Sequence, residues 1–166
     1  MSRLAWISMI TMCVATSARA ENTGARFAAG YAFAKYLEDA EGSAPVGLYF
    51  AGQGLEDVSI KAEAAYHRDS EEFGSYTYTL NTFTGMVGPV VNYAAGTAQG
   101  FVHLLFGARE DRFEGDGNLS LGGEIGAGFD IPVSPKAFMR PGVDFQVFTD
   151  DGYTLKILRL SMGIAW

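Results

Sequence analysis

The sequence is poor in the residues that carry most metal and thiol chemistry. Cys13 is its single cysteine, and His67 and His103 are its two histidines. An intramolecular disulfide is therefore excluded, and two histidines without a second thiol are a weak basis for a zinc site. Lysine and arginine are also scarce, 12 against 19 acidic residues for a net charge of −7, which argues against a nucleic-acid partner. The composition predicts a protein with no metal and no cofactor.

The first twenty residues have the pattern of a secretory signal peptide. Arg3 gives a positive start, residues 4–15 form an apolar stretch, and Ala18 and Ala20 frame a small-x-small cleavage site. We expect residues 1–20 to be removed on export. A retained membrane anchor is the alternative, but it needs a longer apolar run.

Residues 21–166 are then expected to form one domain. Loss of Arg3 and Arg19 reduces the basic residues from 12 to 10 against 19 acidic ones, so the mature net charge is −9. The domain lacks an apolar run of about 18 residues, which argues against a transmembrane helix. The chain is rich in glycine, with 21 residues, and 13% of it is aromatic, a composition that favours many short strands.

Alternation with period two recurs along this domain and predicts an all-β fold. In residues 58–67, VSIKAEAAYH, the apolar set that starts at Val58 and Ile60 alternates with Lys61 and Glu63. A soluble sandwich or calycin barrel would carry a solvated face rich in Lys, Glu and Thr. Here the polar face is mostly glycine and alanine with single charges, which suits a narrow lumen, while the bulky face suits lipid.

The pattern predicts an eight-stranded antiparallel up-and-down transmembrane β-barrel. The expected strands are residues 25–36, 46–53, 58–68, 76–93, 98–109, 119–131, 136–149 and 153–166. Eight is an even number, as in bacterial barrels. The fourth strand loses its alternation at Gly88 and Pro89, where we expect a bulge or another irregularity.

The connections predict which end of the barrel faces outward. Transmembrane barrels have long outer loops and tight periplasmic turns. The acid-rich connections, expected to be outer loops, are residues 37–45, 69–75, 110–118 and 150–152, and the short ones are 54–57, 94–97 and 132–135. Aromatic residues at strand ends predict two girdles in the lipid interface, one of Tyr36, Phe73, Tyr76, Phe113 and Tyr153 and the other of Phe27, Tyr93, Phe101, Phe138 and Trp166.

Five stretches resemble the small outer-membrane β-barrel domain family, the OmpA/OmpX-like, porin-family eight-stranded barrels. They are TFTGMVGP, GFVHLLFG, LGGEIGAGFDI, MRPGVDF and LRLSMGIAW, and the resemblance covers residues 25–166. It implies an outer-membrane protein with lipid and lipopolysaccharide around it, monomeric, and assembled by the barrel-assembly machinery. It also implies an assembly signal on the last strand, namely Leu158, Leu160, Met162, Ile164 and Trp166, although phenylalanine is commoner than tryptophan at the final position.

Charged and polar residues on the inward faces are the candidate functional residues. They are Lys61, Glu63, His103, Glu124, Arg140, Asp144, Gln146 and Arg159. One interpretation is a gated pore or a catalytic cluster. The interpretation we favour is a set of ion pairs that fills a lumen too narrow for a channel. In particular, we expect Glu124, Asp144, Arg140 and Arg159 to form a closed network.

Two further motifs suggest other chemistry. YHRDSEE holds His67, Ser70 and Glu71 or Glu72, the residue types of a lipid A deacylase, but the closely spaced His-x-Ser motif of that family is missing. DRFEGDGN offers Asp111, Glu114, Asp116 and Asn118 as oxygen ligands, but it lacks the spacing of an EF-hand loop. We therefore predict a structural or surface-interaction barrel with no catalytic residues, and keep a deacylase or a soluble periplasmic calycin-like barrel as alternatives.

Overall fold

The computed structural model describes residues 24–37, 45–73, 76–113, 116–150 and 152–166, with the backbone alone for 71–73 and 76–78. The expected signal peptide lies outside these residues, so its cleavage stays a prediction. In the described part of the chain, no helix is long and apolar enough to cross a membrane.

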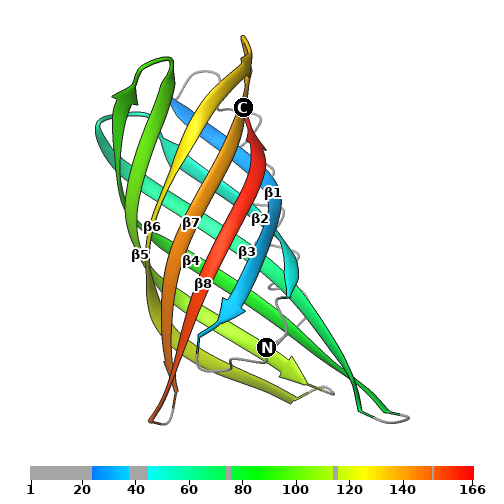
Figure 1. Ribbon diagram of the computed structural model, residues 1–166. Coiled ribbons are helices and arrows are strands. Elements are labelled where there is room, and N and C mark those ends of the chain that lie inside the picture. The colour runs from blue at the N-terminus through cyan, green and yellow to red at the C-terminus, as the bar shows by residue number, and fades with distance from the viewer. Residues whose placement is uncertain (1–23, 38–44, 74–75, 114–115, 151) are drawn as a thin grey trace.

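Eight antiparallel strands form one closed barrel, which confirms the predicted fold (Figure 1). The strands are β1 (Ala25–Tyr36), β2 (Val46–Gly54), β3 (Val58–Phe73), β4 (Tyr76–Ala95), β5 (Ala98–Phe113), β6 (Asp116–Ser134), β7 (Ala137–Asp150) and β8 (Tyr153–Ala165). Every strand pairs with its neighbours in the sequence, and β1 also pairs with β8. The first and last strands therefore close the barrel against each other.

The seam between β1 and β8 closes the sheet. Ala28 pairs with Ala165, and the register continues to Tyr36 opposite Ile157. Just beyond the end of β8, Phe27 N donates to Trp166 O at 3.0 Å and Trp166 N donates to Phe27 O at 2.8 Å. Each unpaired backbone group in hydrocarbon costs several kcal/mol, so this closure is what allows the wall to face lipid.

The two ends of the barrel are distinguished by the connections that lie there. We name the end with the β1–β2, β3–β4, β5–β6 and β7–β8 connections the hairpin end, and the end with the other three connections and Trp166 the turn end. At the turn end, Gly96 and Thr97 connect β4 to β5, and Pro135 and Lys136 connect β6 to β7. In Figure 1 the β3–β4 hairpin extends to the lower right of the barrel.

Much of the sequence expected to form long outer loops is instead strand. β3, β4, β5 and β6 have 16, 20, 16 and 19 residues, whereas about 9–11 residues suffice to cross a bilayer. The segments 69–73 and 110–113 continue the ladders of β3 and β5, because each finds a register partner in the next strand. The acidic residues there extend from paired strands rather than from loops.

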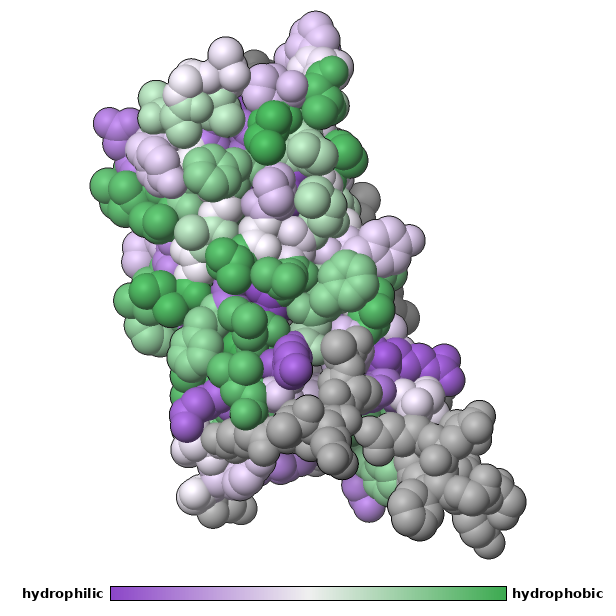
Figure 2. Space-filling view, in the orientation of Figure 1, coloured by the Kyte–Doolittle hydropathy of each residue, from purple (hydrophilic) through white to green (hydrophobic). Residues whose placement is uncertain are grey.

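The outer surface of the barrel is apolar. Side chains such as Tyr31, Ile60, Leu121, Ile125 and Leu160 are 53% to 67% exposed, and Figure 2 shows apolar side chains across much of the visible wall. The row Leu158, Leu160, Met162, Ile164 and Trp166 lies on this surface, 38% to 53% exposed. A soluble protein rarely exposes an apolar zone of this extent.

The predicted aromatic girdles are partly wrong. Tyr93 and Trp166 at the turn end and Phe113 and Tyr153 at the hairpin end are exposed. In contrast, Phe101 lies on the inward face and is 2% exposed. Phe27 has the outward parity of Tyr31 and Phe33, and its ring stacks on Phe50, which leaves it 8% exposed. Phe138 packs beneath the Arg26 guanidinium, and the Tyr36 hydroxyl accepts from Arg109, so these side chains have interior partners. The expectation failed because position along a strand does not tell which face a residue occupies. The side chains of Phe73 and Tyr76 lie outside the described ones.

The irregularity expected in β4 is a gap in pairing and no bulge. Gly88 and Pro89 pair with β3 but not with β5, and the β4–β5 register is the same on both sides of the gap. Proline has no N–H to donate to a ladder, which accounts for the missing bridges. The register shift of the barrel lies elsewhere, between Pro132 and Ser134 in β6.

Candidate functional site in the barrel lumen

The inward face of β5 gives the order of the layers that fill the lumen. From the hairpin end to the turn end, its buried side chains are Arg109, Leu105, His103 and Phe101. Since alternate residues of a strand share one face, a polar layer, an apolar layer and a charged layer follow one another along the axis. The other strands add to each layer at the height that their register sets.

Arg159 of β8 is the centre of the charged layer. Its Nη2 lies 2.8 Å from Asp144 Oδ2 and 3.2 Å from Glu124 Oε2, and it also contacts Glu63 Oε1. Arg159 Nε adds a hydrogen bond of 3.0 Å to Asp144 Oδ2. With 1% exposure, this guanidinium joins β3, β6 and β7 across the interior. A buried charge is tolerated only when it is paired and hydrogen-bonded in this way.

His103 of β5 completes the central cluster. Its Nε2 lies 2.8 Å from Glu124 Oε1 and 3.2 Å from Asp144 Oδ1. Lys61 Nζ lies 3.4 Å from His103 Nδ1 and 2.9 Å from Glu63 Oε2. Three carboxylates thus face two permanent cations, and His103 supplies a third positive charge only when it is protonated.

Among the described residues, His103, Glu124 and Asp144 form a group whose donor atoms are close enough to hold a metal ion. One donor atom each from His103, Glu124 and Asp144 lies within 4.8 Å of the others. The second oxygens of both carboxylates are engaged, because Glu124 Oε2 accepts from Gln146 Nε2 at 2.6 Å and Asp144 Oδ2 accepts from Arg159. Hydrogen bonds and ion pairs therefore account for the carboxylates of this cluster.

Arg140 does not join this cluster, which corrects the expected network. Its Nε donates to Asp130 Oδ1 at 2.6 Å and its Nη2 to Asp130 Oδ2 at 2.7 Å. Arg26 Nη1 of β1 reaches the same carboxylate at 2.7 Å and also donates to Gln99 Oε1 at 2.9 Å. On β7, Arg140 is two inward positions nearer the turn end than Asp144, so Asp130 of β6 is its nearer partner. We missed Asp130 and Arg26, although both occupy inward positions of the alternation.

An apolar layer separates the central cluster from the hairpin end. It consists of the buried residues Ala34, Met86, Leu105, Phe148 and Ile157. Beyond it, Arg109 Nε lies 2.7 Å from Asp111 Oδ2, and Arg109 Nη2 donates to Tyr36 Oη at 2.9 Å. Thr82 Oγ1 donates to Asp111 Oδ1 at 2.5 Å. The sequence analysis did not predict this ion pair, although Arg109 and Asp111 are two residues apart and therefore share the inward face of β5.

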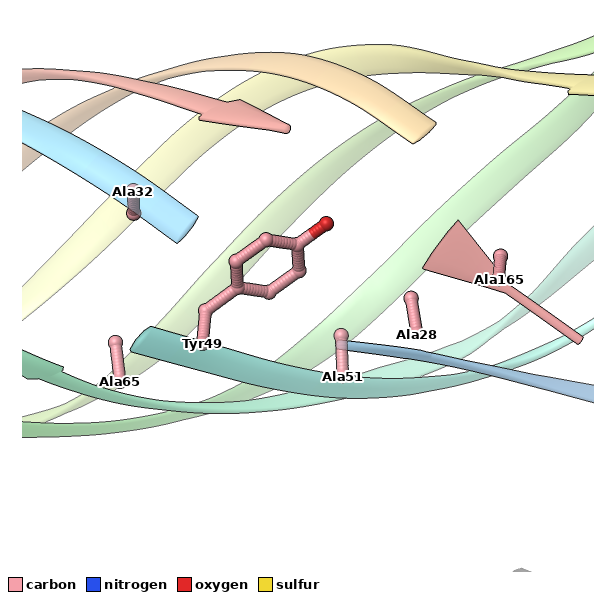
Figure 3. Close-up of a cluster of buried hydrophobic side chains, with 6 residues drawn as sticks. All are labelled: Ala28, Ala32, Tyr49, Ala51, Ala65 and Ala165. Carbon is pink, nitrogen blue, oxygen red and sulfur yellow. The ribbon is translucent and has the colours of Figure 1, made fainter. Parts of the chain in front are cut away.

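Small residues make room for these large side chains. Ala28, Ala32, Ala51, Ala65 and Ala165 surround Tyr49 on one side of the lumen (Figure 3). A methyl group added at Gly126 would lie 2.1 Å from Asp144 Oδ1 and 2.6 Å from His103 Nε2. Glycine and alanine on the inward faces therefore leave the space that the large charged side chains fill.

The residues of the deacylase alternative do not converge. His67 faces the lumen and is 6% exposed, whereas Ser70, three positions along the same strand, occupies the opposite face. The side chains of Glu71 and Glu72 lie outside the described ones. A nucleophile needs its base within hydrogen-bond reach, and His67 and Ser70 are not arranged in that way.

The loop ligands of the calcium alternative are also partly engaged elsewhere. Asp111 pairs with Arg109, and Asn118 Nδ2 donates to Asp150 Oδ2 at 2.5 Å. Glu114 lies outside the described residues.

Comparisons with solved structures find the same fold in outer-membrane barrels. The Neisserial surface protein A aligns over 86% of this chain and 96% of its own, with a TM-score of 0.69 and 11% identity. OprG of Pseudomonas aeruginosa covers 86% and 95%, with a TM-score of 0.56 and 12% identity. Ail, the attachment invasion locus protein of Yersinia pestis, covers 86% and 97%, with a TM-score of 0.53 and 16% identity.

These similarities define the class of the protein by its fold. The chain has the architecture of the small eight-stranded outer-membrane barrels, as the resemblance of its sequence implied. No protein-family model and no curated protein matches the sequence.

Proposed function

We propose that this protein is an outer-membrane barrel with a structural or surface-interaction role, and neither a pore nor an enzyme. The observation that carries the proposal is the filled lumen: Arg159, Glu63, Glu124 and Asp144 form a buried ion-pair network inside a wall whose outer face is apolar. Such a wall fits lipid. An interior built of paired charges contributes rigidity instead of a water path.

In this proposal the hairpin end faces the outside of the cell and the turn end faces the periplasm. Long hairpins outside and tight turns inside are the usual arrangement of bacterial barrels. The barrel-assembly machinery would insert the chain, with Leu158 to Trp166 as the strand that it recognises. We expect a monomer, because a closed sheet offers no edge to a second copy.

Fractionation tests the location. Cells that express the protein should carry it in the outer-membrane fraction, and the folded form should migrate differently on a gel before and after boiling. Recovery from the soluble periplasm would contradict the proposal and favour the calycin-like alternative.

Conductance tests the closed lumen. Planar bilayers that contain the refolded barrel should show little or no steady current, because the charged layer and the apolar layer of Leu105 and Phe148 both fill the interior. A large and stable open state would overturn this part of the proposal.

The protruding β3–β4 and β5–β6 hairpins are the surfaces that a partner outside the cell would meet. The name of Ail, an attachment invasion protein, supports adhesion as the role to test. Cells that express the protein, or a variant in which residues 70–79 are replaced by a two-residue turn, would be compared for adhesion to host matrix. If cells with the protein, cells with the shortened variant and cells without the protein all adhered equally, adhesion would be contradicted and the structural role would stand as the proposed function.

The lipid A deacylase remains the second candidate, carried only by the residue types of YHRDSEE. Mass spectra of lipid A from cells with and without the protein should be identical. Loss of one acyl chain that depends on Ser70 would overturn the non-enzymatic proposal.

A further inference from the structure

Four buried side-chain atoms of the described residues have no hydrogen-bond partner. They are Tyr49 Oη, Gln53 Oε1, His67 Nε2 and Arg140 Nη1. Buried polar groups are almost always hydrogen-bonded, so each exception needs a physical reason. Tyr49 and Arg140 are 5% and 2% exposed, and the unpartnered atom of each can donate a hydrogen bond. These two donors lie on the same row of the sheet, which suggests one reason for both.

The register places Tyr49 and Arg140 at the two ends of a row that crosses four strands. Tyr49 of β2 pairs with Gly30 of β1, Gly30 pairs with Gly163 of β8, and Gly163 pairs with Arg140 of β7. All four positions have inward parity. Because the two central residues are glycines, no side chain stands between Tyr49 and Arg140 along this row.

The Tyr49 side chain extends over the glycines toward Arg140. In Figure 3 its ring rises from β2 into the lumen, with the hydroxyl at the far end. A methyl group added at Gly163, the register partner of Arg140, would lie 2.5 Å from Tyr49 Oη. Among the charged side chains that act on this hydroxyl, Arg140 has the strongest effect. The space above the two glycines is therefore where the phenol and the guanidinium approach each other.

Arg140 also belongs to a group with an excess of positive charge. Its Nε and Nη2 donate to the two oxygens of Asp130, and Arg26 donates to the same carboxylate. Two arginines thus share one acid, and Nη1 is the nitrogen of Arg140 that this acid does not engage. A buried charge needs a partner of the opposite sign. A ligand at this position would have to be small, accept hydrogen bonds and carry negative charge.

We propose that the row from Tyr49 to Arg140 is a binding site for one small monovalent anion, such as chloride, which accepts from Tyr49 Oη and Arg140 Nη1. The carboxylates that act on the Tyr49 hydroxyl are Glu63 and Asp144, and both are paired with Arg159, so they leave these two donors to the anion. An ordered water would offer the same hydrogen bonds without the charge. This binding site is separate from the structural or surface role proposed above.

The test measures urea unfolding of the refolded full-length barrel in uncharged detergent micelles, with sodium chloride or sodium gluconate at equal ionic strength. A ligand that binds only the folded state stabilises it, so the urea midpoint should be higher in chloride than in gluconate, which is too large for the site. Tyr49→Phe should bind chloride about tenfold more weakly or worse, since it deletes a hydrogen bond to a charged ligand. Tyr93→Phe is the matched control, because it removes a hydroxyl from an outward side chain that is 43% exposed, and it should keep the wild-type dependence on chloride.

The chloride NMR line gives a second measurement that needs no unfolding. The wild type and Tyr93→Phe should broaden this line, and Tyr49→Phe should broaden it less. Equal urea midpoints of the wild type in the two salts would overturn the anion and leave an ordered water only. Equal chloride dependence of the two tyrosine variants would overturn the assignment to this row. The heat-modifiable gel shift confirms that each variant is folded, and the wild-type comparison alone still tests the anion if Tyr49→Phe does not fold.

Discussion

The two faces of the same strands obey different rules. On β8, Leu158 and Leu160 point outward and are 38% and 53% exposed, whereas Arg159 between them is 1% exposed and contacts three carboxylates. The outer face meets lipid, which adapts to the shape of any apolar side chain. The inner face meets other side chains, so each residue there must match its partners in both volume and charge. We therefore expect a given change to have opposite consequences on the two faces.

The largest effect should follow from a charge at the seam of the outer face. Trp166→Asp places a carboxylate in the apolar row beside the Phe27 pairing and should lower outer-membrane levels to less than about a tenth of wild type, because an unclosed sheet edge in lipid costs several kcal/mol per group. Trp166→Phe keeps the row apolar and should assemble normally. Quantitative blots of outer-membrane fractions check both variants, and normal assembly of the Asp variant would show that this position is an ordinary strand residue.

The second largest effect should follow from removal of the Arg159 guanidinium from the inner face. Arg159→Met keeps the length of the side chain but leaves Glu63, Glu124 and Asp144 without their shared partner. The free energy of unfolding should fall by about 3–5 kcal/mol, measured by urea titration of the refolded barrel in micelles. In the double variant with Asp144→Asn, part of the loss should return, because one uncompensated carboxylate is gone. An equal loss in both variants would argue against coupling of these charges.

The third prediction adds a cation to the lipid-facing side of the same strand, where the preceding variant removed one from the lumen. Leu160→Arg should destabilise the barrel by about 2–4 kcal/mol, the cost of arginine near the bilayer midplane, and Leu160→Ile should be nearly neutral. Unfolding titrations in phospholipid vesicles measure the difference. If the arginine variant were as stable as the isoleucine variant, this part of the wall would not contact hydrocarbon.

The smallest expected effect comes from added side-chain volume at two adjacent residues of β6, one on the inward face and one on the outward face. Gly126→Ala adds a methyl group against Asp144 and His103 and should destabilise the barrel by about 1–3 kcal/mol. Ala127→Leu adds a larger group on the outer face and should change stability by less than about 0.5 kcal/mol, since lipid moves aside. Equal effects at both positions would contradict the difference between the faces.

The sequence predicted the fold well because alternation and turn chemistry are local properties. All eight strands were found, and the residues assigned to the interior, such as Lys61 and Glu124, are buried. The partners were less predictable. Arg140 pairs with Asp130, not with Glu124 or Asp144, because the choice depends on the register between β6 and β7, which no local pattern reports.

Strand length and the aromatic girdles show the same limit. The acids at residues 69–73 and 110–113 suggested loops, yet the strands continue because their partners are also extended. Phe101 was expected in lipid and is buried in the lumen, since an aromatic ring suits either face and only the parity of its position decides.

Closure of the sheet also makes the order of the strands cyclic, although the chain that forms them is linear. β1 forms nine residue pairs with β8 and nine with β2, so the seam between the first and last strands is equivalent in kind to a seam inside the chain. Joining Trp166 to Gly24 by a short linker and opening the chain at Gly96 and Thr97 would give a circular permutant with every pairing retained. What such a rearrangement changes is the sequence distance across each seam, and with it the order in which the strands must find one another.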